Sequence, residues 1–205
     1  MFLIIGCGRS GTKYISNLLR VSNLDVGHEV FGKDGVVSWE MTPDDGGFSC
    51  GIRKEKGKEN KCDFNVIIHQ VRDPLKQIRS FLTVSRGKME NGIRSPWWDY
   101  IGLYTSVIPT LGPTLHNCMK YYYEWNKIAE NRADWRFRIE NIDKVYDKLC
   151  YKLNITPNFE ILSNLSRTLN ERRKVGNLLT WDDLYNEDDK LCEKIHFMAN
   201  MYGYT

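Results

Sequence analysis

The stretch that most constrains the fold of this chain is its first fourteen residues, MFLIIGCGRSGTKY. An apolar, partly β-branched run at 2–5 predicts a short buried strand. Three glycines follow at Gly6, Gly8 and Gly11, and an apolar helical stripe begins at Tyr14. A strand, a glycine-rich turn and a helix together form a cradle for an anion, because glycines let the backbone approach the ligand and the first helical N–H groups face it.

The polar residues of this cradle (residues 6–13) suit the same role. Arg9 and Lys13 add positive charge, while Ser10 and Thr12 add hydroxyl donors. The spacing of the two outer glycines fits the first part of a Walker A loop, G-x-x-x-x-G-K-[ST], but here the hydroxyl residue precedes the lysine. A glycine turn that only ends a strand is the alternative interpretation.

Composition fits one domain with a hydrophobic core. The chain has 205 residues, of which 41% are hydrophobic and 12% aromatic. The net charge of +3 is modest, so composition gives no reason to expect nucleic acid as a partner. No stretch approaches the roughly 20 apolar residues of a membrane span, and the run at 2–5 is too short for a signal segment. We therefore expect a cytoplasmic protein, or a catalytic domain cut from an anchor.

Six cysteines are scattered along the chain without a C-x-x-C pair or a Cys/His cluster, so we expect no zinc site. Cys50 and Cys62 flank a polar stretch and could pair in an oxidising compartment. Free thiols in a reducing cytosol are the favoured interpretation.

A second informative stretch follows about sixty residues after the cradle. Val66–Val71 predicts a central strand, and Asp73 with Pro74 predicts the start of a helix, as N-cap and first-turn proline. Arg72, at the strand end, offers a planar fork for a phosphate, and Ser80, two turns into the helix, adds a hydroxyl donor.

Together these two stretches resemble the nucleotide-binding segments of sulfotransferases that use 3′-phosphoadenosine 5′-phosphosulfate (PAPS). Gly8–Thr12 resembles their 5′-phosphosulfate loop, and Arg-Asp-Pro with a serine eight residues after the arginine, Arg72 to Ser80, resembles their 3′-phosphate segment. The resemblance covers residues 1–29 and 65–82 well and the remainder loosely. It implies a single three-layer α/β domain over the whole chain, with a central parallel sheet and a P-loop NTPase-like fold.

The resemblance also implies which residues bind PAPS and its product, adenosine 3′,5′-bisphosphate (PAP). Six successive residues of the cradle would hold the 5′-phosphosulfate: Gly8, Arg9, Ser10, Gly11, Thr12 and Lys13. Arg72 and Ser80 would hold the 3′-phosphate, and Arg173 or Lys174, from a basic stretch near the end of the chain, would close over it. Sulfuryl transfer in this family needs no metal.

A candidate base follows the strand predicted at 24–29, which ends in His28 and Glu29. In doubly wound α/β folds, ligands sit beyond the carboxyl ends of the strands. Sulfotransferases that act on protein tyrosine or heparan-type sugars have a glutamate at about this point as general base. We therefore expect Glu29 to take the proton of an acceptor hydroxyl, with His28 as second candidate or positioning residue, and Arg9 or Lys13 to balance charge on the leaving group. A surface glutamate beside a capping histidine is the alternative.

The remaining sequence predicts one long loop and further regular elements. Segment 31–63 shows no lasting hydrophobic period, so we expect a mobile loop on the acceptor side. We also expect a strand at 135–139 and helices at 96–108, 113–131, 144–153 and 187–201. Two further helices are expected to begin at Thr156-Pro157 and after a cap formed by Thr180 and Asp183.

Two other functions remain open at this point. A P-loop kinase or nucleotidase would need a carboxylate for magnesium, whereas the predicted strand at 66–71 is followed by Arg72. A non-catalytic nucleotide-binding module would keep both phosphate segments without a usable base. The acceptor itself, a carbohydrate, a tyrosine or a small molecule, is not specified by these motifs.

Overall fold

The computed structural model describes residues 1–43, 63–83, 96–108, 113–165 and 178–204. Internal contacts divide the chain into two compact units. The first unit consists of Met1–Val71 and Ile128–Arg172, and the second of Arg72–Lys127 and Arg173–Thr205. The single domain expected from the sequence stays a prediction.

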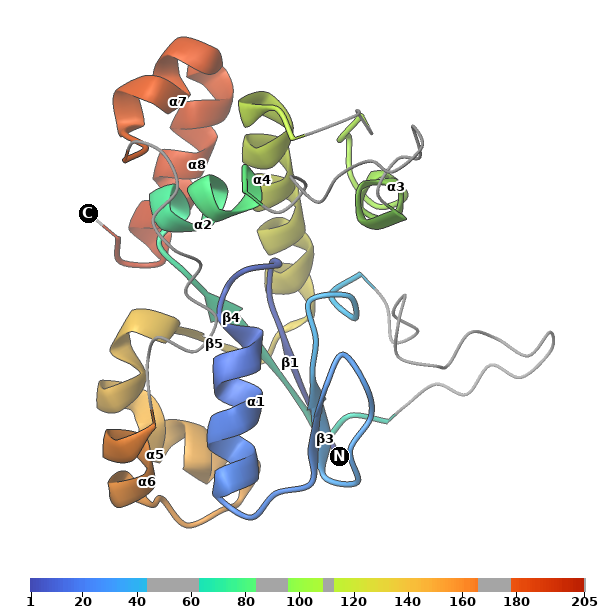
Figure 1. The fold of residues 1–205 in the computed structure, drawn as a ribbon, viewed down its shortest axis with the longest axis vertical. Coiled ribbons are helices and arrows are strands. Elements are labelled where there is room, and N and C mark those ends of the chain that lie inside the picture. Colours follow the sequence, from blue (N-terminus) through green and yellow to red (C-terminus); the bar gives the residue numbers. More distant parts are fainter. Residues whose placement is uncertain (44–62, 84–95, 109–112, 166–177, 205) are drawn as a thin grey trace, which may run out of the picture. The chain divides into compact units, whose positions relative to one another are not determined.

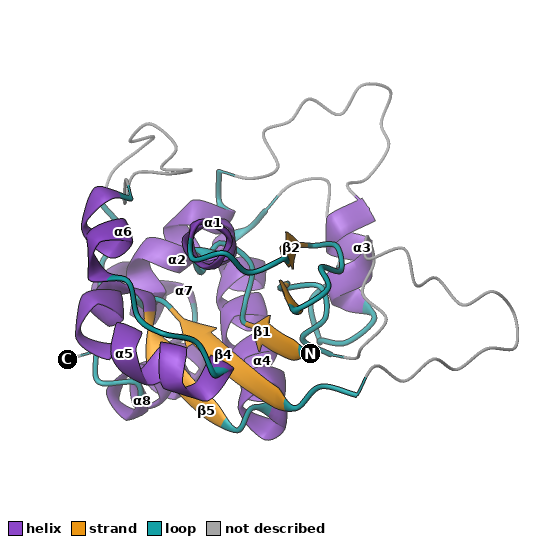
Figure 2. Ribbon diagram, turned by 90° about the horizontal axis from the view of Figure 1, so that it is seen from below, coloured by secondary structure: helices purple, strands orange, loops and turns teal. Residues whose placement is uncertain are grey.

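A five-stranded parallel sheet forms the centre of the first unit (Figure 1). Its strands are β1 (Phe2–Ile5), β2 (Val26–His28), β3 (Gly35–Val37), β4 (Val66–Val71) and β5 (Trp135–Arg138), in the order β2-β3-β1-β4-β5. All four strand pairings are parallel, and Figure 2 shows β1, β4 and β5 side by side. The predicted α/β class with a central parallel sheet is confirmed.

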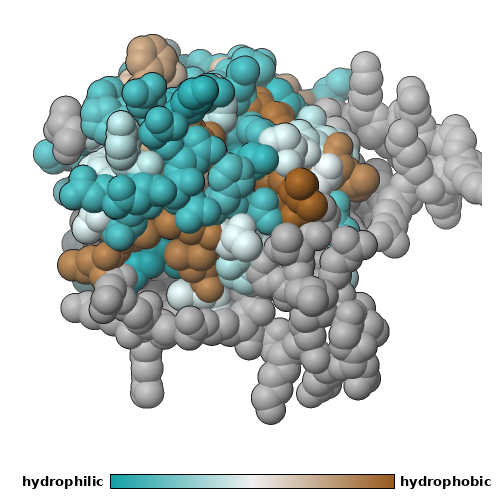
Figure 3. Space-filling model, turned by 90° about the horizontal axis from the view of Figure 1, so that it is seen from above, coloured by the Kyte–Doolittle hydropathy of each residue, from teal (hydrophilic) through white to brown (hydrophobic). Residues whose placement is uncertain are grey.

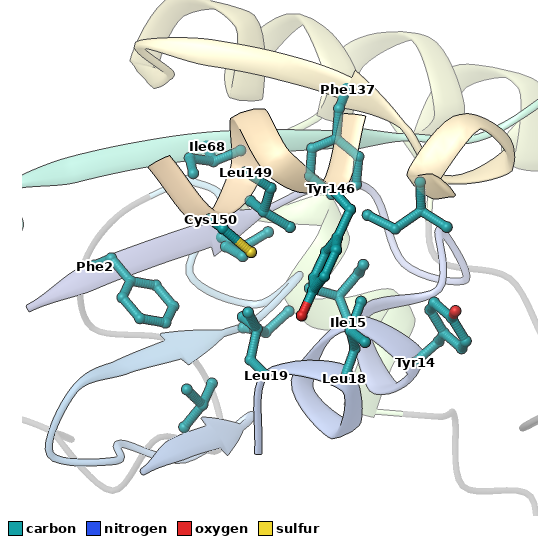
Figure 4. Close-up of a cluster of buried hydrophobic side chains, with 14 of the residues drawn as sticks. Phe2, Tyr14, Ile15, Leu18, Leu19, Ile68, Phe137, Tyr146, Leu149 and Cys150 are labelled. Atoms are coloured by element: carbon teal, nitrogen blue, oxygen red, sulfur yellow. The ribbon is translucent and has the colours of Figure 1, made fainter. Parts of the chain in front are cut away.

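Alternate residues of each strand face opposite sides of this sheet, and helices cover both sides. On one side, β-strand residues such as Ile4 and Phe137 pack against α1 (Thr12–Val21), α5 (Ile142–Leu153) and α6 (Phe159–Asn164). Figure 4 shows labelled side chains of α1 and α5 pointing toward one another. On the other side, the core consists of Leu3, Ile5, Val36, Met41 and, from α4 (Leu115–Arg132), Ala129. Full burial of each large aliphatic side chain contributes about 1.5–3 kcal/mol.

The connection between β2 and β3 is short for two parallel strands. The loop predicted at 31–63 is wrong in its first part, because this part contains β3. The chain turns back within residues 29–34, where the Asp34 N–H donates to the Asp25 carbonyl at 3.0 Å. A Cβ on Gly27 would overlap the Val30 carbonyl oxygen, so glycine permits this close return. Gly35–Val37 then forms β3, and a strand of this length is too short to show a period. Residues 44–62 lie outside the described residues.

Helices form the described part of the second unit: α2 (Pro74–Phe81), α3 (Pro96–Gly102), the first turns of α4, α7 (Trp181–Glu187) and α8 (Asp189–Met201). Aromatic rings of α2, α3 and α4 pack together, with centroids 4.7 Å apart for Phe81 and Tyr121 and 5.2 Å apart for Trp97 and Tyr121. Rings at these separations and tilted angles stabilise one another beyond their burial. The aromatic residues of α3 and α4 therefore build a core.

Two predicted helix starts are confirmed by their capping bonds. The Asp73 carboxylate accepts a hydrogen bond from the Lys76 N–H at 3.0 Å, with Pro74 in the first turn of α2. Thr180 and Asp183 form a capping box at the start of α7, in which the Thr180 N–H donates to the Asp183 carboxylate at 2.8 Å.

Two other predicted helix boundaries are wrong. The helix expected at 96–108 ends at Gly102. The helix expected to open at Thr156-Pro157 begins at Phe159, because Asn158 is the residue whose side chain accepts from the first-turn N–H of Ile161, at 3.2 Å.

The surface seen in Figure 3 is mostly hydrophilic, and the hydrophobic side chains there form small groups. In the described part of the chain, no helix combines the length and the apolar character needed to cross a membrane.

Candidate phosphate-binding site

The cradle connects β1 to α1 through two residues in the left-handed region. Arg9 has φ 64° and Gly11 has φ 98°. Gly11 is the N-cap of α1 and provides no side-chain cap, so the first turn of the helix keeps its donors. Alternation of left-handed and right-handed residues turns successive N–H groups toward one concave side, a geometry that binds anions.

Several donors of this cradle are available to a ligand. Among the described residues, none accepts a hydrogen bond from the N–H groups of Gly11, Thr12 or Lys13. The Ser10 hydroxyl is buried, has no partner in the described part of the chain, and lies 3.0 Å from where a Cβ on Gly6 would be. Because leaving such groups unpaired is costly, this donor set fits an oxyanion such as a phosphosulfate.

Two buried side chains from elsewhere in the first unit anchor the cradle. The Thr42 hydroxyl accepts from the Gly6 N–H at 3.3 Å and donates to the Gly6 carbonyl at 3.0 Å. The Gln70 side-chain N–H donates to the Ser10 carbonyl at 2.6 Å. Sequence reasoning missed both residues. A polar side chain within the apolar strand was the one available signal for Gln70, and Thr42 gave none.

His28 and Glu29, predicted from the sequence, lie beside the cradle at the carboxyl end of β2. The His28 Nε2 atom lies 3.1 Å from the Thr12 hydroxyl and 3.6 Å from the Glu29 Oε1 atom. The Glu29 carboxylate accepts hydrogen bonds from the Ser38 hydroxyl and, at 3.4 Å, from the Trp39 N–H. The His28 side chain therefore lies between the cradle and the Glu29 carboxylate.

Burial shifts the pKa values of both residues. It raises the pKa of Glu29 to about 8, with a further rise from the Glu40 carboxylate, while the Ser38 hydrogen bond opposes the shift. Burial lowers the pKa of His28 to about 4, and the positive charges of Lys13 and Arg20 add to this. At neutral pH His28 is therefore uncharged, and Glu29 retains its proton in most molecules.

Arg72 and Ser80 belong to the second unit, where both are half-buried. Arg72 directly follows β4, and its carbonyl accepts from the Tyr122 hydroxyl at 3.4 Å. Ser80 lies in the last turn of α2. The predicted basic residues Arg173 and Lys174 lie outside the described residues.

Four cysteines of the described residues are free and buried: Cys7, Cys118, Cys150 and Cys192. No group of three or more His, Cys, Asp and Glu side chains in the described ranges could hold a metal ion. Cys50 and Cys62 lie outside them.

Comparison with known proteins shows that the fold is similar to that of a sulfotransferase. The structure superposes on the crystal structure of mouse sulfotransferase SULT7A1 complexed with PAP, with a TM-score of 0.51 and 15% sequence identity over 95% of this chain and 84% of that chain. No protein-family model and no curated protein sequence matches the chain.

Proposed function

We propose that the protein is a sulfotransferase that moves a sulfuryl group from PAPS to an acceptor hydroxyl. The observation that carries this proposal is the cradle, in which the N–H groups of residues 11–13 and the buried Ser10 hydroxyl have no hydrogen-bond partner among the described residues. Such donors match the oxygens of a phosphosulfate. A structure with this fold, mouse SULT7A1, is complexed with PAP. In the proposal, Gly8–Lys13 bind the 5′-phosphosulfate, and Arg9 adds a positive charge to the cradle.

The 3′-phosphate is assigned to Arg72 and Ser80, on the resemblance of their segment to that of PAPS-dependent sulfotransferases. A guanidinium offers two parallel donors to a phosphate, and a serine hydroxyl adds a third. Arg173 or Lys174 is assigned as the cation that closes over this phosphate.

Glu29 is the proposed general base, as in sulfotransferases of the tyrosine and heparan type. When bound, PAPS supplies the sulfuryl group. Glu29 in its ionised form accepts the proton of the acceptor hydroxyl, and its raised pKa makes it a stronger base than an ordinary carboxylate. Ser38 and the Trp39 N–H hold the carboxylate in place.

The neighbouring residues complete the proposed chemistry. His28, uncharged at neutral pH, lies between Thr12 and Glu29 and is the positioning residue or second candidate base. Arg9 or Lys13 balances negative charge that develops on the oxygen between phosphorus and sulfur. The proposal assigns no metal ion, and the acceptor is a hydroxyl of a carbohydrate, a tyrosine or a small molecule.

Ligand-induced thermal stabilisation tests the nucleotide part of the proposal. A ligand at 100 times its dissociation constant adds about 2.7 kcal/mol to the free energy of unfolding, which corresponds to roughly 5–10 °C for a chain of this size. We expect this shift with PAP and not with ATP-magnesium. A shift with ATP-magnesium alone would overturn the sulfotransferase assignment in favour of a kinase.

Transfer of labelled sulfate from PAPS to an acceptor panel tests the reaction itself. The panel contains a tyrosine peptide, a heparan-type oligosaccharide and a phenol. Binding of PAP without transfer to any hydroxyl, or release of sulfate to water, would favour a non-catalytic nucleotide-binding module.

A further inference from the structure

Gln70 holds one peptide group of the cradle in a fixed direction. It lies one residue before the end of β4, and its side chain is fully buried. Its Nε2–H donates to the carbonyl of Ser10 at 2.6 Å. Ser10 precedes Gly11, the N-cap of α1, so this carbonyl takes no part in the hydrogen bonds of the helix.

The same peptide group carries the Gly11 N–H. The described chain contains no cis peptide bond, and in a planar trans peptide the N–H points opposite to the C=O. Because Gln70 draws the Ser10 carbonyl toward β4, it aims the Gly11 N–H away from β4. Among the described residues this N–H has no acceptor.

The other end of the Gln70 carboxamide argues against a purely stabilising role. Its Oε1 atom is buried and has no hydrogen-bond partner within the described residues. Leaving a buried carbonyl oxygen unpaired disfavours folding, whereas an apolar side chain of similar length would fill this position without stranding an oxygen. An apolar replacement would in turn leave the Ser10 carbonyl without this donor, so the two effects on stability oppose each other and the distinct effect of Gln70 is the direction of the peptide that it holds.

We propose that Gln70 is a positioning residue that aims the Gly11 N–H at the anionic 5′ group of the nucleotide. This inference rests on the proposed function, since it needs a ligand with an anionic 5′ group in the cradle. Gln70 would therefore affect binding of a 5′-phosphate and leave recognition of the 3′-phosphate unchanged.

The test compares two ligands that differ only at the 5′ position. The dissociation constants of PAP and of adenosine 3′-monophosphate, which lacks the 5′ phosphate, are measured by titration calorimetry for the wild-type chain and for Gln70→Met. We expect the variant to bind PAP about tenfold more weakly, the loss of roughly one well-aimed hydrogen bond to a charged group, and to bind adenosine 3′-monophosphate as the wild type does. We also expect its midpoint of thermal unfolding to change little, because the variant exchanges the unpaired Gln70 Oε1 atom for an unpaired Ser10 carbonyl.

Asn126→Leu is the matched control. Asn126 is a buried carboxamide that donates to a backbone carbonyl, of Tyr122, at 2.8 Å and lies in the second unit. Its substitution should leave the ratio of the two affinities unchanged. Gln70→Leu provides a second apolar variant if Gln70→Met fails to fold.

The outcomes separate this inference from the proposed function. Unchanged PAP affinity in both Gln70 variants, or an equal loss for both ligands, would overturn the inference alone. A wild-type protein that binds neither ligand would overturn the proposed function and the inference with it.

Discussion

The Thr12 hydroxyl lies 3.1 Å from Nε2 of His28, and this contact joins the cradle to the proposed general base. The same nitrogen lies 3.6 Å from the Glu29 carboxylate. Thr12 begins α1 and His28 ends β2, so the tertiary fold brings a helix start and a strand end together. In the proposed function, a donor to the sulfuryl source and a base for the acceptor would then act from neighbouring positions.

Glu29→Gln should retain nucleotide binding and lose most turnover. The amide has nearly the same shape but cannot accept the acceptor proton, and general-base assistance is worth about 10²–10⁴-fold in rate. The rate of sulfate transfer and the dissociation constant of PAP measure the two effects. Glu160→Gln, an exposed glutamate on α6, is the control and should behave as wild type. Equal turnover in Glu29→Gln would remove Glu29 from the mechanism.

Stability should fall as pH rises from 6.5 to 8 because of Glu29. Its pKa is raised from 4.5 to about 8, so in this range the folded state binds more protons than the unfolded state. The stability contributed by the protonated carboxyl is complete below 4.5 and is lost as pH rises through 8, with a slope of at most about 1.4 kcal/mol per pH unit. Urea unfolding at several pH values measures it, and Glu29→Gln should flatten the slope.

The titration of His28 is the reason that the effect of Glu29 on stability is measured above pH 6.5. Its pKa is lowered from 6.5 to about 4, so between these values the unfolded state binds the extra proton and stability rises with pH. The contributions of His28 and Glu29 therefore oppose each other below pH 6.5. A slope above pH 6.5 that is the same in wild type and in Glu29→Gln would contradict the assignment to Glu29.

Ser38→Ala should move the acidic limb of the pH–rate profile to higher pH. The Ser38 hydroxyl donates to the Glu29 carboxylate and holds its pKa down against burial. Without this donor fewer molecules carry an ionised Glu29 at neutral pH, so kcat/KM should fall by about tenfold at pH 7 and recover at high pH. Ser163→Ala, in which the lost hydroxyl is exposed on α6, should leave the profile unchanged. A pH-independent loss would assign Ser38 a structural role only.

Gly11→Ala should lower both the stability of the fold and the affinity for nucleotide, whereas backbone strain at a position outside the cradle should lower stability alone. Gly11 has φ 98°, and a left-handed non-glycine residue costs about 1–2 kcal/mol. An added Cβ would also lie 3.1 Å from the Gln70 Nε2 atom and from Ile139. Gly203→Ala is the matched control, because Gly203 has φ 79° near the end of the chain. Both variants should lose stability in urea unfolding, and only Gly11→Ala should lose PAP affinity. Parallel losses of affinity would argue against the cradle as the binding site.

Arg72→Ala should weaken binding of PAP by about tenfold or more and leave binding of 5′-AMP unchanged. Charged hydrogen bonds to a phosphate are stronger than neutral ones, and 5′-AMP lacks the 3′-phosphate that Arg72 would contact. Calorimetric titration with both ligands measures the difference. Lys76→Ala, an exposed cation on α2, is the control. An unchanged affinity for PAP would remove Arg72 from the 3′-phosphate site.

The local elements around the phosphate segments followed from the sequence alone. One continuous stretch encodes the strand at Phe2–Ile5, the glycine turn and the apolar stripe of α1. A second continuous stretch encodes β4 and the Asp73 cap of α2. Such features depend on propensity, periodicity and capping between near neighbours, which a single sequence displays directly.

The contacts that shape the site were decided by the tertiary structure. Strand β3 is too short to produce a period, and it forms because β1 and the glycine-permitted return from β2 provide its hydrogen bonds. Thr42 and Gln70 reach the cradle across 36 and 60 residues of sequence. A side-chain hydrogen bond at that separation depends on which strands lie next to each other, and the order β2-β3-β1-β4-β5 is a property of the folded sheet. The residue types of the proposed anion cradle can thus be read from a local stretch of sequence, whereas the side chains that hold the cradle in place are determined by the pairing of the strands.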